Sequence, residues 1–122
     1  MKEERKILFH KNYFTDFYLG QTKNVQEKIE YVLKIIKTVE RVPEKFLKHL
    51  EGTDGLYEIR VEYGSNIFRI FCCFDKGNLV VLFNAYQKKT QKTSKEEINL
   101  AEKLKKEYFI IKNRNLQNKT YK

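Results

Sequence analysis

Arginine side chains and groups that can exchange a proton occur close together in the middle of this chain. Arg60 and Arg69 lie in two neighbouring stretches that are rich in β-branched and aromatic residues. A guanidinium group binds phosphate through two parallel hydrogen bonds, so this pair indicates a site for an anion. Glu58 and His49 lie near Arg60 in the sequence and are of types that move protons. Such residue types suit chemistry at a phosphodiester.

Cleavage of RNA requires few parts from a protein, because the ribose 2′-OH attacks its own adjacent phosphate. The protein must align the reacting groups, stabilise the charge on the phosphorane and help to move two protons. Cationic side chains can do the electrostatic part without a metal ion. The candidate catalytic residues are Arg69, Arg60, Lys89, His49 and Glu58.

Signatures of other chemistries are absent from the sequence. It contains no phosphate-binding loop, dinucleotide-binding glycine motif, GxSxG turn or HExxH motif. His10 and His49 are far apart in the sequence, so we predict no metal site and no cofactor. Cys72 and Cys73 are adjacent in a predicted strand and should point to opposite faces. We therefore expect neither a disulfide nor a shared metal between them, but two space-filling side chains.

The first half of the chain predicts a strand followed by a helical hairpin. Residues 7–9 form a short apolar run, and aromatic residues recur at helical spacing over 13–18. Asn24 and Glu27 have the spacing of a capping box. Apolar residues then recur every three or four positions over 25–39, which indicates a long amphipathic helix that ends before the single proline.

The second half predicts a loop over residues 44–55, a three-stranded antiparallel meander and a final helix. Ser94 and Glu97 have the spacing of a second capping box before that helix. Residues 112–122 are polar and mostly basic, so we expect a flexible tail beside one domain over 1–111. The predicted class is α+β: an N-terminal strand and helical hairpin packed on a small antiparallel sheet, with a C-terminal helix. The predicted strands are 56–63, 67–74 and 79–86.

The two short turns of the meander fix its expected register. A two-residue loop at Gly64-Ser65 places Arg60 opposite Arg69, and one at Lys76-Gly77 places Arg69 opposite Asn84. The three side chains would form a row on one face. The other face should be the main core under the helices. Its predicted members are Tyr57, Ile59, Val61, Phe68, Ile70, Cys72, Phe74, Leu79, Val81, Phe83 and Ala85.

Two arginines that face each other across a sheet repel and require compensation. Ion pairs with Glu58 and Glu62 would supply it, and so would a bound phosphate. Both hold if the glutamates partner the arginines while the site is empty. Further basic and aromatic side chains precede and follow these strands, where they would contact RNA. The candidate RNA-binding residues are Lys45, Lys48, Tyr86, Lys88 and Lys92.

Positive charge is concentrated toward the C-terminus. The net charge is +9; residues 1–86 carry 14 Lys or Arg against 12 Asp or Glu, and residues 87–122 carry 11 against 4. Such a field attracts nucleic acid, acidic proteins or anionic lipid. No apolar run approaches the about 18 residues of a membrane span, and the charged start does not read as a signal peptide. We therefore expect a cytoplasmic protein without a membrane partner.

Three short motifs occur in order: Leu56-Tyr57-Glu58-Ile59-Arg60, Phe68-Arg69-Ile70, and Lys88-Lys89-Thr90 before the last helix. Their combination resembles the phage-derived Gp49-like/HigB branch of the RelE/ParE toxin superfamily, over residues 7–108. This resemblance implies a RelE-like fold and the toxin of a type II toxin–antitoxin pair. RelE and HigB toxins cut mRNA in the ribosomal A site, so mRNA and the ribosome are implied partners. A further implied partner is a cognate antitoxin, often a helix-turn-helix HigA-like protein that alone contacts the operator DNA.

The resemblance also implies roles for single residues. Arg69 matches the phosphate-stabilising arginine of the middle strand, and Arg60 matches a basic position on the preceding strand. The Lys88-Lys89 pair matches a segment that holds a catalytic arginine in RelE-type members, and Lys45 and Lys48 match the region of RNA-contacting lysines. Some members have a proton-transferring Tyr or His near the chain end. Here none follows Lys92 before Tyr108, so His49, Glu58 and Tyr86 remain open candidates.

Two other functions remain open at the level of the sequence. A ParE-like protein would bind DNA gyrase and cut nothing, and a non-catalytic module would only bind nucleic acid. The facing pair Arg60 and Arg69, together with Lys88-Lys89, favours cleavage, because a gyrase inhibitor needs no phosphate site on its sheet.

Overall fold

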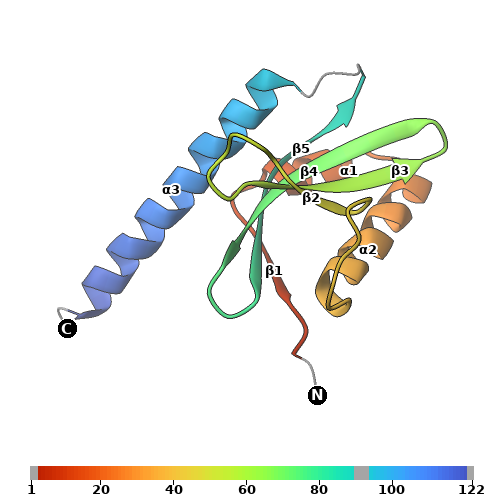
Figure 1. Cartoon of the computed structure of the whole chain (residues 1–122). Coiled ribbons are helices and arrows are strands. Elements are labelled where there is room, and N and C mark those ends of the chain that lie inside the picture. The colour runs from red at the N-terminus through yellow and green to blue at the C-terminus, as the bar shows by residue number, and fades with distance from the viewer. Residues whose placement is uncertain (1–2, 90–93, 121–122) are drawn as a thin grey trace.

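A five-stranded sheet lies between two helical layers (Figure 1). The computed structural model describes residues 3–89 and 94–120, with side chains described as far as Leu116. The strand order is β1-β5-β4-β3-β2, with β1 parallel to β5 and the other neighbours antiparallel. This arrangement confirms the predicted α+β class. The elements are β1 (Lys6–Phe9), α1 (Tyr13–Leu19), α2 (Lys23–Thr38), β2 (Leu47–His49), β3 (Tyr57–Tyr63), β4 (Asn66–Asp75), β5 (Leu79–Lys88) and α3 (Lys95–Thr120).

The first layer consists of α1 and α2, which cover one face of the sheet. Val25, Ile29, Val32 and Ile36 form the buried stripe of α2, as their spacing predicts. The predicted capping box of this helix was wrong, because α2 begins earlier than Asn24. The side chain of Thr22 accepts a hydrogen bond from the Val25 N–H and caps the helix instead. At the other end, the Arg5 guanidinium donates to the carbonyl oxygens of Ile36, Val39 and Glu40.

The second layer is α3, which covers part of the opposite face. Ser94 caps it, since Ser94 Oγ accepts from the Glu97 N–H at 3.4 Å, but the Glu97 carboxylate accepts from Asn84 and does not reach back. The helix continues to Thr120, where the sequence predicted a loose tail from residue 112. The segment 112–120 contains no glycine or proline, so a helix can continue through it without an apolar period of its own.

Two cores therefore exist, one on each face of the sheet. Cys72 belongs to the core under α1 and α2 and Cys73 to the core under α3, which confirms that they face opposite sides. Both thiols are buried and free, and burial raises the pKa of Cys73 to about 11. The core between the sheet and α3 consists of the buried residues Leu56, Phe71, Cys73, Val81, Phe83, Ala101, Leu104 and Tyr108.

The predicted register of the meander was right for the first hairpin and wrong for the second. Tyr63 pairs with Asn66 and Arg60 with Arg69, as predicted. Asp75, however, pairs with Leu79, because the turn has three residues and its last one, Asn78, adopts a φ of 66°. Leu79, Val81 and Phe83 consequently lie on the α3 face and not in the predicted core.

A β-bulge shifts the register between β4 and β5 once more. The irregularity lies between Ile70 and Cys72, and beyond it Arg69 pairs with Tyr86. Asn84 therefore leaves the predicted row, and its Nδ2 donates to the Glu97 carbonyl oxygen at 3.0 Å. The row across the sheet is Arg60, Arg69 and Tyr86.

Candidate functional site

A cleft opens on the α3 face of the sheet, where β2, β3, β4 and β5 contribute polar side chains. Its volume is about 410 Å³. The short strand β2, which the sequence analysis assigned to a loop, pairs with β3 and brings Lys48 to the position opposite Glu58. Only three residues long and without an apolar alternation, β2 gave no signal in the sequence. The cleft is lined by Glu44, Lys48, His49, Leu50, Glu51, Glu58, Arg60, Arg69 and Lys88.

The floor of the cleft is an ion pair between Arg69 and Glu58. Arg69 Nη1 donates to both carboxylate oxygens of Glu58, and the residues are 7% and 3% exposed. Burial alone would lower the pKa of Arg69, but the hydrogen bonds and the charge of Glu58 outweigh burial and raise the pKa. The guanidinium therefore stays charged. Its Nε is buried and has no hydrogen-bond partner among the described residues.

Arg60 lies beside Arg69, and its ion pair with Glu62 is more exposed than that between Arg69 and Glu58. Its Nε is 3.0 Å from Glu62 Oε1, and both side chains are at least one third exposed. That contact lacks hydrogen-bond geometry, so the Arg60 Nε also stands as a buried donor without a partner in the described part of the chain. Two arginines thus meet as predicted, and each lies near a glutamate.

The end of β5 contributes one lysine to the cleft lining, whereas the predicted RNA contact Tyr86 does not line the cleft. Lys88 lines the cleft, and burial, followed by the charge of Arg69, lowers its pKa. Tyr86 stacks on Phe71 with ring centroids 5.8 Å apart, and its hydroxyl accepts from the Ser94 N–H at 3.4 Å. Lys89 is exposed just beyond β5 and does not line the cleft. The predicted RNA contact Lys92 lies outside the described residues.

The predicted residues before β3 divide into two groups. Lys48 and His49 line the cleft, and the His49 ring packs edge-on against Tyr57 with centroids 5.2 Å apart. Lys45 lies outside the cleft lining, with its Nζ over the Phe46 ring at 4.9 Å from the centroid. The sequence analysis missed Glu44 and Glu51, because carboxylates in a polar loop carry no signal of their own.

Tyr108 does not replace the missing proton-transfer group of the family pattern. Its hydroxyl donates to Asp75 Oδ2 at 2.7 Å, at the turn between β4 and β5, and it does not line the cleft. Burial, followed by that hydrogen bond, raises the pKa of Tyr108 to about 12. Tyr108 therefore holds α3 to the sheet at a place away from the arginines.

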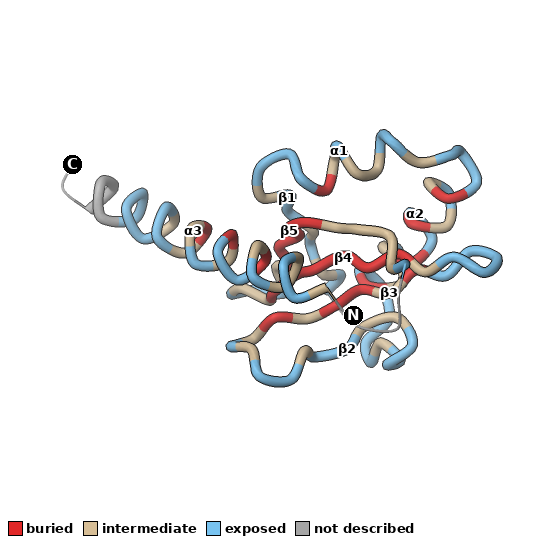
Figure 2. The backbone as a smooth tube through the Cα atoms, turned by 90° about the horizontal axis from the view of Figure 1, so that it is seen from above, coloured by how far each residue is buried: buried red, intermediate tan, exposed pale blue. Residues whose placement is uncertain are grey.

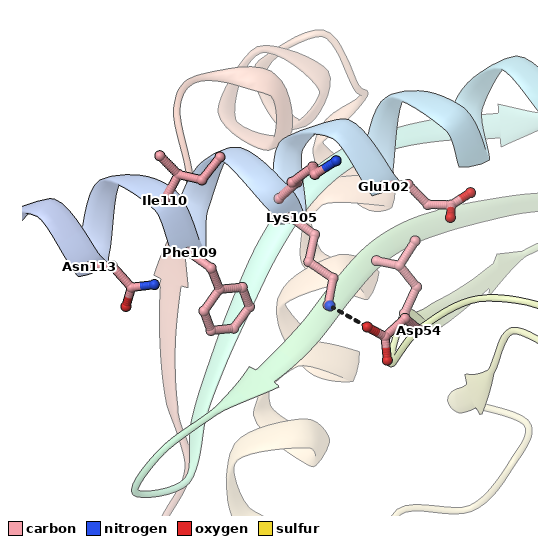
Figure 3. Close-up of a pocket in the computed structure, with 8 residues that line it drawn as sticks. Asp54, Glu102, Lys105, Phe109, Ile110 and Asn113 are labelled. Carbon is pink, nitrogen blue, oxygen red and sulfur yellow. Dashed lines mark ion pairs between the residues drawn. The ribbon is translucent and has the colours of Figure 1, made fainter.

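A second cavity, of about 380 Å³, lies between α3 and the loop before β3 (Figure 3). Leu56 and Phe109 give it apolar walls, while Lys105 extends toward Asp54 with Nζ 4.0 Å from the carboxylate. Acidic and basic groups alternate around it, so it lacks the convergence of cations seen in the cleft. Within residues 3–89 and 94–120, no group of three or more His, Cys, Asp or Glu side chains is arranged to hold a metal ion, and no helix is long and apolar enough to cross a membrane.

Comparison with protein families gives a match over most of the chain. The family described as phage derived protein Gp49-like (DUF891) matches residues 16–106. The chain belongs to this family. Its matched region contains β2 to β5, so the Gp49-like domain includes the whole cleft. A search of curated proteins gave no match.

Two solved structures resemble this Gp49-like chain at low identity. One is the RelB-RelE antitoxin–toxin complex from Methanococcus jannaschii, with 15% identity, a TM-score of 0.48, and coverage of 65% of this chain and 87% of that chain. The other is the archaeal RelE-RelB complex from Pyrococcus horikoshii OT3, with 18% identity, a TM-score of 0.47, and coverage of 66% and 91%.

Proposed function

We propose that this Gp49-like protein is the toxin of a type II toxin–antitoxin pair and an endoribonuclease that cuts mRNA in the ribosomal A site. One observation supports the proposal above all others. Arg60 and Arg69 lie opposite each other on neighbouring strands, and both line one cleft that Lys48 and Lys88 also line. A phosphodiester is an anion of the size and charge that such paired donors bind.

The cleft residues can divide the reaction between them. Arg69 is fixed by Glu58 and Arg60 lies opposite it, so both can stabilise charge on the phosphorane at the moment the 2′-OH attacks. Lys88 and Lys48 add positive charge at the rim. The proton-transfer group stays open between His49, Glu58 and Tyr86: the Glu58 carboxylate already accepts from Arg69, and the His49 ring packs on Tyr57, a residue of the core under α1 and α2.

The proposed partners follow from the same assignment. The mRNA substrate would enter with the ribosome, and a helix-turn-helix HigA-like antitoxin would neutralise the toxin and contact operator DNA. Residues 87–122 carry 11 Lys or Arg against 4 Asp or Glu, and this excess of positive charge suits the binding of mRNA and ribosomal RNA. We propose that the reaction takes place in the cytoplasm.

Inducible expression combined with mapping of mRNA 5′ ends tests the proposal. The wild-type chain should arrest growth and create new 5′ ends within translated codons. Arg60→Ala should remove most of these ends, because it deletes one phosphate donor and leaves the buried pair of Glu58 and Arg69 in place. Arg41→Ala is the matched control, since Arg41 is an exposed arginine outside the cleft.

Three outcomes would contradict nuclease function. Growth arrest without new 5′ ends would favour a gyrase inhibitor, which can be checked by DNA supercoiling in the arrested cells. Binding of RNA without cleavage, steeply weakened by salt, would favour a non-catalytic module. Full activity of Arg60→Ala would remove the cleft from the mechanism.

A further inference from the structure

The two arginines of the cleft are held by glutamates in different ways. Arg69 Nη1 donates to both carboxylate oxygens of Glu58, and the two side chains are 8% and 4% exposed. The side chains of Arg60 and Glu62 are 36% and 59% exposed, and Arg60 Nε lies 3.0 Å from Glu62 Oε1. Burial fixes the first pair, whereas water or a ligand can compete for the members of the second.

Glu62 lies where β3 leads into its hairpin with β4. In Figure 2 the tip of this hairpin is exposed, whereas the strands behind it are largely buried. Side chains alternate along a strand, so Glu58, Arg60 and Glu62 are on one face, with the arginine between two carboxylates. Glu58 is bound by Arg69, which leaves Glu62 for Arg60. Arg60 lines the cleft and Glu62 does not, so this ion pair spans the border of the cleft.

The empty cleft concentrates positive charge that needs a counter-ion. The lysines and arginines that line it are Lys48, Arg60, Arg69 and Lys88. Burial and then the charge of Arg69 lower the pKa of Lys88, and the charge of Arg60 also lowers it. A carboxylate beside Arg60 offsets this repulsion while no anion is bound. A phosphate in the cleft would have the same effect, so the phosphate and Glu62 would compete for Arg60.

The two ion pairs differ in what their rupture costs. An exposed pair such as that of Arg60 and Glu62 contributes little free energy, and a guanidinium gains two parallel hydrogen bonds when it turns to a phosphate. Rupture of the pair of Arg69 and Glu58 would leave a carboxylate buried without its partner. Arg60 is therefore the arginine that can change its partner, and Arg69 is the one that stays in place.

We propose that Glu62 is a displaceable counter-ion that sets the affinity of the cleft for a phosphodiester, and that Arg60 moves from the Glu62 carboxylate to the phosphate when RNA binds. Arg69 keeps its bonds to Glu58 throughout. Glu62 is a positioning residue in this scheme, because it acts on the ligand only through Arg60. The inference rests on the proposed function in taking an RNA phosphate as the ligand, but it requires binding alone and no cleavage.

Titration of the full chain with a 2′-O-methyl trinucleotide tests the inference. This probe has phosphodiesters but no free 2′-OH beside them, so it binds without being cut. NMR signals of the cleft residues give its dissociation constant. Glu62→Gln should lower that constant about two- to fivefold, the range expected from release of an exposed ion pair. In the wild type, the carboxyl carbon signal of Glu62 should shift as the probe takes Arg60 from it.

A double-mutant cycle separates this exchange from a general effect of charge. In the Arg60→Ala background, Glu62→Gln should no longer tighten binding, because no guanidinium remains to be released. Glu51→Gln is the matched control, since Glu51 is an exposed glutamate that lines the cleft, whereas the carboxylate paired with Arg60 is that of Glu62. Any gain from Glu51→Gln should be the same with and without Arg60. Circular dichroism and the unfolding midpoint of each variant would show that the fold persists.

Four results would overturn the inference. They are no shift of the cleft signals when the probe is added, an unchanged dissociation constant in Glu62→Gln, a gain that persists in the Arg60→Ala background, and a Glu62 carboxyl signal that stays in place while the probe binds. The nuclease proposal fails separately. Tighter binding by Glu62→Gln in a protein that cuts no mRNA would support the counter-ion and reject the nuclease, and cleavage with no effect of Glu62→Gln on binding would do the reverse.

Discussion

Glu58 on β3 accepts hydrogen bonds from Arg69 on β4, and the two residues are diagonal neighbours on the α3 face of the sheet. Arg60, which pairs directly with Arg69, has its own glutamate in Glu62, with Nε and Oε1 3.0 Å apart. Each arginine thus has a nearby carboxylate, which offsets their mutual repulsion. The sequence analysis offered ion pairs with these two glutamates as one of two ways to offset the repulsion, beside a bound phosphate, and the structure shows both ion pairs.

The buried pair makes Arg69→Ala a test of stability as well as of activity. Removal of the guanidinium leaves the Glu58 carboxylate buried without its partner, which should lower the free energy of unfolding by about 3 to 5 kcal/mol. Urea denaturation of the purified variant measures this loss. The double variant Glu58→Gln/Arg69→Met should recover most of it. A loss below about 1 kcal/mol for Arg69→Ala would mean that water reaches the carboxylate.

A second prediction concerns Asp75, which holds α3 to the turn between β4 and β5. Burial alone would raise its pKa, but hydrogen bonds from Lys112, Tyr108 and the Lys76 N–H lower the pKa below its ordinary value of 3.8. A carboxyl with a lowered pKa stabilises the folded state above pH 3.8, and this stability is lost as pH falls through the folded-state pKa.

Asp75→Asn should therefore flatten the acid limb of the stability curve. Urea denaturation between about pH 7 and pH 3 measures the slope, which reports protons taken up on unfolding. Asp54→Asn is the control, because that carboxylate is fully exposed and its contact with Lys105 Nζ is loose, at 4.0 Å. An unchanged slope in Asp75→Asn, or an equal change in Asp54→Asn, would contradict the prediction.

The sequence predicted the order of the long elements because their apolar spacing is strong and local. The stripe of α2, the first hairpin at Gly64-Ser65 and the cap at Ser94 all depend on residues near one another in the chain. The pairing of Arg60 with Arg69 was predicted correctly because it depends only on that first hairpin turn. The polar, basic composition of residues 112–120 suggested a loose tail, but these residues are helical. A helix that has begun needs only residues that tolerate helical geometry to continue.

The second hairpin shows what local patterns could not supply. Lys76-Gly77 suggested a two-residue turn, but Asn78 also adopts a positive φ, and the third turn residue moves every pair by one. The bulge opposite Phe71 then adds a further residue on β5. At this bulge Asn84 donates to the Glu97 carbonyl oxygen of α3, and such a long-range contact leaves no periodic trace in the sequence.

A third prediction separates two candidate caps of α2. Thr22→Ala should lower the free energy of unfolding by about 1 kcal/mol, because the Val25 N–H loses its acceptor. Asn24→Ala is the matched control and should change stability by less than about 0.5 kcal/mol, since Asn24 lies inside the first turn. Thermal or urea unfolding of both variants measures the difference. A larger effect at Asn24 would favour the capping box that the sequence pattern suggested.

The final prediction uses the two adjacent lysines at the end of β5. Lys88 lines the cleft, and burial together with the nearby charge of Arg69 lowers its pKa, whereas Lys89 is exposed and outside the cleft lining. If the cleft cuts RNA, Lys88→Ala should slow cleavage of a ribosome-bound mRNA about a hundredfold, a typical effect of losing one group that stabilises transition-state charge. Lys89→Ala should slow it severalfold at most, through weaker attraction of RNA. Single-turnover cleavage at two salt concentrations separates these effects, because added salt weakens the attraction of RNA and should shrink the Lys89→Ala defect, while the Lys88→Ala defect should persist. If Lys89→Ala proved the more damaging change, the catalytic groups would lie in the segment after β5 and not in the cleft.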